Sequence, residues 1–174
     1  MRLVLALMML PGLALADAFG TTNPEELTMN KVLEDIDAGR TSMTNCAAGY
    51  LMTKSGRHGA ARKTFEACAG DGYPGAMTWM GYLDNNGFGG DYDPDAAAEW
   101  DRRAAEAGDS VGQFNYGLSL LRGYGVPQDE ATGRALIDAA ARTGLPIAQR
   151  LQSAGYDPEA VTPDADNWRY APMN

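Results

Sequence analysis

The chain has 174 residues and a formal net charge of −9, with 23 acidic against 14 basic side chains. This length allows one domain with a fair hydrophobic core, and the acidic balance makes nucleic acid and anionic membrane surfaces poor partners. A basic partner would suit the charge, although a solvated acidic surface explains it equally well.

The first segment, residues 1–16, has the pattern of a secretory signal. Arg2 supplies the positive end, an apolar run follows from Leu3 to Leu10, and Ala14 and Ala16 form a small-residue cleavage site. The alternative, an N-terminal membrane anchor, would need an apolar helix of about 20 residues. We therefore expect cleavage after Ala16, a periplasmic or secreted location, and no membrane insertion of the cleaved chain.

Residues 17–42 form the expected N-terminal helical segment. Asn23 is suited to cap a helix, and Pro24 is suited to its first position. Acidic residues follow at the positive end of the helix dipole. We expect a helix from there to about Ile36, packed on the hairpin that follows.

The two cysteines lie in neighbouring predicted helices, Cys46 early in the first and Cys68 late in the second. The turn between these helices centres near Arg57, which is 11 residues from each cysteine. Two antiparallel helices of equal rise return to the same level, roughly 16 Å below the turn, and export brings the chain into an oxidising compartment. We therefore predict a disulfide that contributes roughly 3 kcal/mol in the chain-entropy model. Two buried free thiols are the alternative.

The stretch from Ala76 to Gly108 predicts two helices separated by a glycine-rich loop. The first helix has apolar residues at helical spacing and ends at Gly87, because glycine readily adopts the positive φ that ends a helix. The second begins with Asp93 as its N-cap and Pro94 at its first position. One such antiparallel hairpin cannot bury its apolar face alone, so neighbouring hairpins must stack on it.

The same pattern returns when the sequence is shifted by 36 positions. Several glycines and an aspartate at a helix start each recur 36 positions later, which is the pattern of an internal repeat. The matched pairs are Gly81 and Gly117, Gly87 and Gly123, Gly89 and Gly125, Asp93 and Asp129, and Gly108 and Gly144. Gly81 and Gly117 lie inside the first helix of their hairpins, where glycine costs about 1 kcal/mol against alanine. We therefore expect another helix to approach closely there.

These residues resemble the Sel-1-like repeat family, relatives of the tetratricopeptide repeats. The more specific element is the loop Gly123-Tyr124-Gly125-Val126-Pro127-Gln128-Asp129. The resemblance implies an all-α superhelix of α/α hairpins within residues 43–161, with about three hairpins and a capping helix. It also implies an interaction scaffold without catalysis, and some cysteine-rich secreted relatives tie their paired helices together in the way predicted above.

We number the hairpins unit one (43–72), unit two (76–108) and unit three (112–144). Unit one departs from the pattern because Lys54-Ser55-Gly56 stands where the Gly-x-Gly loop is expected. After unit three, the stretch Pro146–Leu151 opens a truncated capping unit.

Residues 162–174 are predicted to be a flexible polar tail. Trp168 and Tyr170 are unusual for such a tail. They either fold back onto the stack or serve as a docking peptide.

No group of residues in the sequence has a recognisable catalytic or metal-binding spacing. His58 is the single histidine, and a surface or capping role outweighs catalysis for it. The stretch Asp91–Asp95 resembles the start of a calcium loop, but Ala96 and Arg102 stand where glycine and glutamate are required. We interpret it as a loop end and helix cap, and we expect no metal, no cofactor and no enzymatic activity.

The remaining functional surface is the concave face of the superhelix, which tetratricopeptide-like repeats line with the first helices of their hairpins. The candidate partner-binding residues are Tyr50, Trp79, Tyr82, Asn86, Asn115, Leu118 and Arg122. Aromatic residues and arginine dominate binding hot spots, which favours Trp79 and Arg122. The alternative for Tyr82 and Leu118 is a place in the core between repeats, where Trp100 is also expected.

Three functional hypotheses remain. The first is an exported, monomeric scaffold that binds a protein or peptide partner on its concave face. The second, drawn from proposals for cysteine-rich relatives, is a weak β-lactam-binding or cell-wall enzyme; the stretch Ser55–His58 does not match the Ser-x-x-Lys that it would need. The third is a small structural or regulatory factor that acts through Trp168 and Tyr170.

Overall fold

The computed structural model describes residues 28–161, and these residues form eight α-helices, one short 3-10 helix and no strand. The predicted all-α hairpin fold is confirmed. The hairpins are α2 (Met43–Lys54) with α3 (His58–Gly70), α4 (Pro74–Asn86) with α5 (Pro94–Glu106), and α6 (Ser110–Arg122) with α7 (Glu130–Arg142). They are flanked by α1 (Met29–Asp37) on one side and by α8 (Pro146–Ser153) and η1 (Pro158–Ala160) on the other.

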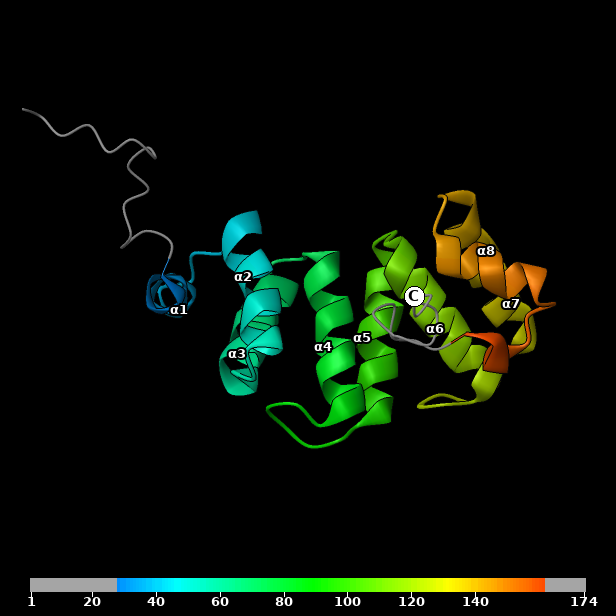
Figure 1. Ribbon diagram of the computed structural model, residues 1–174, viewed down its shortest axis with the longest axis horizontal. Coiled ribbons are helices and arrows are strands. Elements are labelled where there is room, and N and C mark those ends of the chain that lie inside the picture. The colour runs from blue at the N-terminus through cyan, green and yellow to red at the C-terminus, as the bar shows by residue number, and fades with distance from the viewer. Residues whose placement is uncertain (1–27, 162–174) are drawn as a thin grey trace, which may run out of the picture.

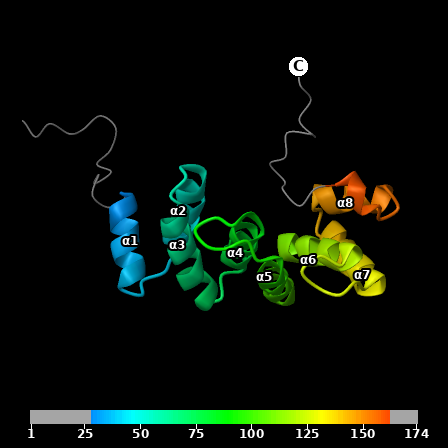
Figure 2. The ribbon, with the colours of Figure 1, turned by 90° about the horizontal axis from the view of Figure 1, so that it is seen from below.

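The helices stack in chain order along the long axis of the molecule, from α1 at one end to α8 at the other (Figure 1). Each helix from α1 to α8 packs on the next one. In Figure 2, α2 and α3 stand nearly upright whereas α6 and α7 lie nearly horizontal, so the helix axes turn along the stack. This turning arrangement of hairpins is that of a solenoid.

The predicted start signals of the second helices act as N-caps. The side chain of Asp93 accepts a hydrogen bond from the Ala96 N–H at 2.9 Å, and that of Asp129 accepts one from the Thr132 N–H at 3.1 Å. Each bond satisfies a backbone donor that the first turn of a helix leaves without a partner. These local interactions fix where each hairpin turns back.

The expected continuous helix from Asn23 to Ile36 is wrong at Thr28. The backbone of Thr28 is extended, with φ −74° and ψ 144°, and its hydroxyl caps α1 by accepting from the Lys31 N–H at 3.2 Å. Threonine is among the residues that cap helices, because its side-chain oxygen can accept a hydrogen bond from this backbone donor. Asn23 itself lies outside the described residues.

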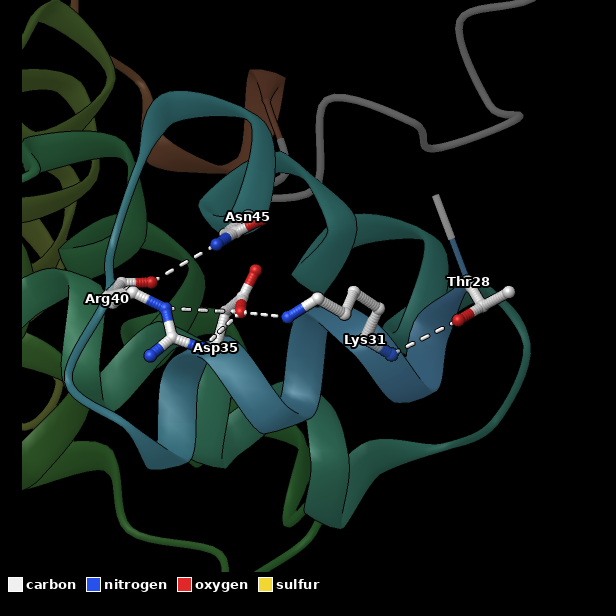
Figure 3. Close-up of polar contacts among 5 residues, drawn as sticks. All are labelled: Thr28, Lys31, Asp35, Arg40 and Asn45. Carbon is white, nitrogen blue, oxygen red and sulfur yellow. Dashed lines mark hydrogen bonds and ion pairs between the residues drawn. The ribbon is translucent and has the colours of Figure 1, made fainter. Parts of the chain in front are cut away.

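A polar network joins α1 to the start of α2 (Figure 3). Asp35 accepts hydrogen bonds from the side chains of Lys31 and Arg40, both at 2.6 Å, and these bonds lower the pKa of Asp35 to about 2. The backbone carbonyl of Arg40 accepts from the Asn45 side chain at 3.1 Å. The N-terminal helix is thereby tied to unit one.

The predicted disulfide between Cys46 and Cys68 is present. It joins α2 to α3, with the two Cα atoms 5.9 Å apart and both cysteines buried. The bond therefore fixes the hairpin whose connection lacks the Gly-x-Gly loop.

Backbones approach closely where the first helices carry an internal glycine, as expected. A Cβ at Gly117 would lie 3.0 Å from the Gly133 carbonyl oxygen, and a Cβ at Gly133 would lie 2.9 Å from the Gly117 oxygen. Side chains at these two positions would force α6 and α7 apart. This contact explains why Gly133 stands where unit two has Ala97 under the 36-residue shift.

The residue that faces the first-helix glycine changes from unit to unit. It is Phe65 in unit one, Asp101 in unit two and Ile137 in unit three, and all three are buried. A Cβ at Gly81 would lie 3.1 Å from the Asp101 carboxylate, and the side chain of Asn115 on α6 donates to that carboxylate at 3.2 Å. A carboxyl group thus occupies a core position between α4 and α6.

Candidate functional site

Trp79 is the centre of a group of aromatic rings on units one and two. Its ring stacks on Phe65 of α3, with centroids 5.6 Å apart and planes inclined by 5°. Tyr50 of α2 and Tyr82 of α4 meet it edge-on, each with centroids at 5.3 Å. Such pairs contribute about 0.5–1.5 kcal/mol beyond the area they bury, so the indole is held in one position.

The rings continue past Tyr82 into the loop after α4. Phe88 meets Tyr82 edge-on at 5.9 Å and stacks on His58 at 4.2 Å. His58 begins α3, as the sequence indicated, and it is half-buried under this contact. We call these five residues, Tyr50, His58, Trp79, Tyr82 and Phe88, the aromatic cluster.

A buried ion pair positions the loop part of the cluster. The Arg62 guanidinium contacts the Asp84 carboxylate at 2.5 Å, and their side chains are 19% and 7% exposed. Arg62 also donates to the Phe88 carbonyl at 3.4 Å, and the Asp93 N–H donates to the Asp84 carbonyl at 3.0 Å. Removing one partner of such a pair leaves a buried charge uncompensated, so the loop is held firmly against α3.

The outer edge of the cluster is apolar and exposed on α2. Tyr50 is 40% exposed, and Leu51 and Met43 are 55% and 75% exposed. Together with Ala47, these residues recur at the spacing of one helix face. Contiguous exposed apolar surface of this kind is typical of interaction sites.

Basic side chains lie beside this apolar edge. The Lys54 ammonium is positioned over the Tyr50 ring, 5.5 Å from its centroid, a favourable cation–π arrangement. Arg57 is exposed at the turn between α2 and α3. The aromatic cluster therefore presents flat rings next to positive charge.

The other predicted partner-binding residues have different surroundings. Asn86 is exposed at the end of α4 and donates to the Tyr82 carbonyl at 2.8 Å, so it borders the cluster. Asn115 is half-buried and its amide donates to Asp101. Leu118 is 2% exposed, so its predicted partner-binding role is wrong and the core alternative holds.

Arg122 is engaged by its own chain. Its guanidinium donates to the carbonyl of Pro158 at 2.6 Å and to that of Val161 at 3.0 Å. Val161 is fully buried in the same apolar cluster as Leu118. The first helix of unit three is therefore covered by residues 158–161, and the expectation that Arg122 is available to a partner is wrong.

Trp100 is only half-buried, although the sequence placed it in the core. One side of its ring packs against the core of units one and two, and the Arg103 guanidinium lies 4.3 Å from its centroid. It lies on α5, the second helix of its unit, and it takes no part in the aromatic cluster.

Within residues 28–161, no three histidine, cysteine or acidic side chains are grouped so that they could hold a metal ion. The same residues include no helix with the length and apolarity needed to span a bilayer.

The Sel1 repeat family model matches residues 74–109 and 110–145, which are units two and three. A comparison with curated proteins found no match. Among solved structures, the chain resembles a Sel1 repeat protein from Oxalobacter formigenes, with a TM-score of 0.65 and 18% identity, covering 81% of this chain and 58% of that one.

The chain also resembles a protective antigen of uropathogenic Escherichia coli strains that displays an SLR fold. The TM-score is 0.53 and the identity 22%, and the match covers 74% of this chain and 33% of that one. At these identities the likeness concerns the fold alone. The chain spans less than two thirds of the length of either protein.

Proposed function

The chain carries two Sel1 repeats in a solenoid of helical hairpins, and we propose that it is an exported scaffold that binds a protein or peptide segment at its aromatic cluster. Sel1 repeats generally form non-catalytic helical scaffolds that mediate protein interactions. Tyr50, Trp79 and Tyr82 of the aromatic cluster lie on the first helices of units one and two, and this supports the proposal because tetratricopeptide-like repeats usually bind along their first helices.

The observation that carries this proposal is the fixed indole of Trp79. Three rings hold it, at centroid distances of 5.3, 5.3 and 5.6 Å. An aromatic side chain that is already held in place loses little conformational freedom when it binds, which is one reason why aromatic residues dominate hot spots. The neighbouring apolar face of α2 extends the surface available to a partner.

The charge beside the cluster favours one kind of partner segment. Lys54 lies over the Tyr50 ring, and Arg57 is exposed at the turn that follows α2, so acidic groups on the partner would be attracted to this edge. We propose a segment that has an apolar or aromatic anchor with acidic residues nearby.

Export is part of the proposal. Residues 1–16 lie outside the described residues, but their sequence pattern is that of a secretory signal. The Cys46–Cys68 disulfide supports an oxidising compartment.

Replacement of Trp79 by alanine should weaken partner binding by more than about tenfold, because hot-spot aromatic residues contribute more than about 1.4 kcal/mol. The tagged chain would be used to capture proteins from an extract of exported proteins, and retention would be compared between the wild type and Trp79→Ala. Trp100→Ala is the matched control, since it removes the same side chain from α5.

Circular dichroism would verify that both variants remain helical. A protein that the wild type and Trp100→Ala retain and that Trp79→Ala releases supports the proposal. Equal retention by both variants contradicts it.

A further inference from the structure

After α8, the chain turns back across the first helix of unit three. The η1 turn packs on α6, and Val161 is fully buried in the cluster that contains Leu118 and Leu121. The two hydrogen bonds from Arg122 hold the carbonyls of Pro158 and Val161. Val161, the last described residue, is therefore held against α6.

This end of the described chain lies beside the unit that carries the aromatic cluster. Leu118 and Arg122 are the counterparts of Tyr82 and Asn86 under the 36-residue shift. Residues 158–161 thus lie over positions of α6 whose equivalents on α4 are Tyr82, a member of the aromatic cluster, and Asn86, which borders it. The helices α4 and α6 are in contact.

The length of the following segment is sufficient to reach the cluster. Packed helices lie about 8–10 Å apart, so α4 and α2 are about 10 and 20 Å from α6. An extended chain advances about 3.3 Å per residue, so the stretch 162–168 can span about 23 Å. Trp168 and Tyr170 are within reach of both Trp79 and Tyr50.

The composition of the segment suits the cluster. Trp168 and Tyr170 can stack with its rings, and Asp164 and Asp166 precede them. The positive charges of Lys54, which lies over the Tyr50 ring, and of Arg57, which is exposed at the turn after α2, complement this pair of acids. An apolar anchor beside acidic residues is the kind of segment that the cluster was argued to bind.

We propose that residues 162–174 bind the aromatic cluster of their own chain and that a partner must displace them. This inference rests on the proposed function, because it treats the cluster as a binding surface. A tethered segment has an effective concentration of about millimolar, so even weak binding of the segment lowers the apparent affinity for a partner.

The test uses the indole N–H signals of Trp79 and Trp100 in nuclear magnetic resonance spectra of the full chain. In the double variant Trp168→Ala/Tyr170→Ala, the Trp79 signal should shift while the Trp100 signal stays in place. A synthetic peptide of residues 162–174 added to this variant should move the Trp79 signal back towards its position in the wild type.

An unchanged Trp79 signal would overturn the proposal, as would equal shifts of both signals. A Trp79 shift that depends on protein concentration would also overturn it, because the segment would then come from a second copy. If the signal is unchanged but Trp79→Ala still abolishes capture, only this inference fails. If the signal shifts but capture is unaffected, the proposed function fails instead.

Discussion

Replacement of Gly125 by alanine should lower the free energy of unfolding by about 2–5 kcal/mol. An alanine Cβ at this position would lie 2.0 Å from the Pro94 carbonyl oxygen and 3.2 Å from the Ala98 Cβ. Gly125 also has a φ of +66°, which is strained for any residue with a side chain. Both costs act together, because the loop cannot move away from α5 without losing its contacts.

The same close contact occurs in the loop of unit two. In unit two, a Cβ at Gly89 would lie 2.7 Å from the His58 carbonyl oxygen. The second glycine of each Gly-x-Gly loop thus approaches the backbone at the start of the second helix in the preceding unit. The loops join neighbouring hairpins, so the substitution tests how the hairpins stack.

Gly155→Ala is the matched control. Gly155 has a φ of +67°, but a Cβ there would meet no atom within 4 Å. Its substitution should cost only the strain, about 1–2 kcal/mol. Urea unfolding followed by circular dichroism measures both variants, and equal losses would show that the loop does not pack on α5 as described.

The second large effect concerns pH and Asp101. Burial between α4 and α6 raises the pKa of Asp101 to about 8, and the hydrogen bond from Asn115 opposes this shift. The carboxyl of an unfolded chain has a pKa of about 3.9. At a pH between these two pKa values, Asp101 is protonated in the folded chain and ionised in the unfolded chain. The contribution of Asp101 to stability should therefore be largest below about pH 4 and should fall as the pH rises towards 8, by about 1.4 kcal/mol per unit for one proton.

The other groups with shifted pKa values affect stability outside the pH range in which Asp101 acts. The lowered pKa values of Asp35, Glu99, Asp129 and Asp138 make stability increase with pH only in the acid range below the ordinary carboxyl pKa. The pKa of Tyr124 is raised to about 12, which affects stability only under alkaline conditions. From about pH 5 to 8, the decline should come mainly from Asp101.

Asp101→Asn should remove this decline. Asparagine has the shape of the protonated acid and can still bond with Asn115, so the variant should match the wild type near pH 4 and exceed its stability increasingly as the pH rises to 8. Urea midpoints at three pH values would show the difference. Asp95→Asn, an exposed change on the same helix, is the control that should keep the wild-type slope. Parallel profiles for Asp101→Asn and the wild type would contradict the account.

Much of the fold was predictable because its signals are local. Asp93 and Asp129 cap their helices through neighbours three residues away, and the disulfide followed from the equal rise of two helices. The cap at Thr28 was not predicted, because Asn23 is followed by Pro24 and acidic residues and therefore carries the stronger start signal in the sequence.

The site was predictable where its residues lie on the first helices of the hairpins, as Tyr50, Trp79 and Tyr82 do. Trp79 and Tyr82 recur at helical spacing, whereas Phe88 and His58 come together only when the loop after α4 folds onto the start of α3. Leu118 and Arg122 were misassigned for a related reason. They are covered by residues 158–161, which lie 36 to 39 positions after Arg122 in the sequence. A pattern of neighbouring residues cannot indicate a contact between segments so far apart.

The central claim is that a partner is held at the aromatic cluster, and photo-crosslinking tests it most directly. A benzophenone amino acid would replace Tyr50, which is 40% exposed at the edge of the cluster. The control position is Ala135, which is exposed on α7. The account predicts a crosslinked partner from position 50 and none from position 135. Crosslinks of equal yield at both positions, or at position 135 alone, would contradict it.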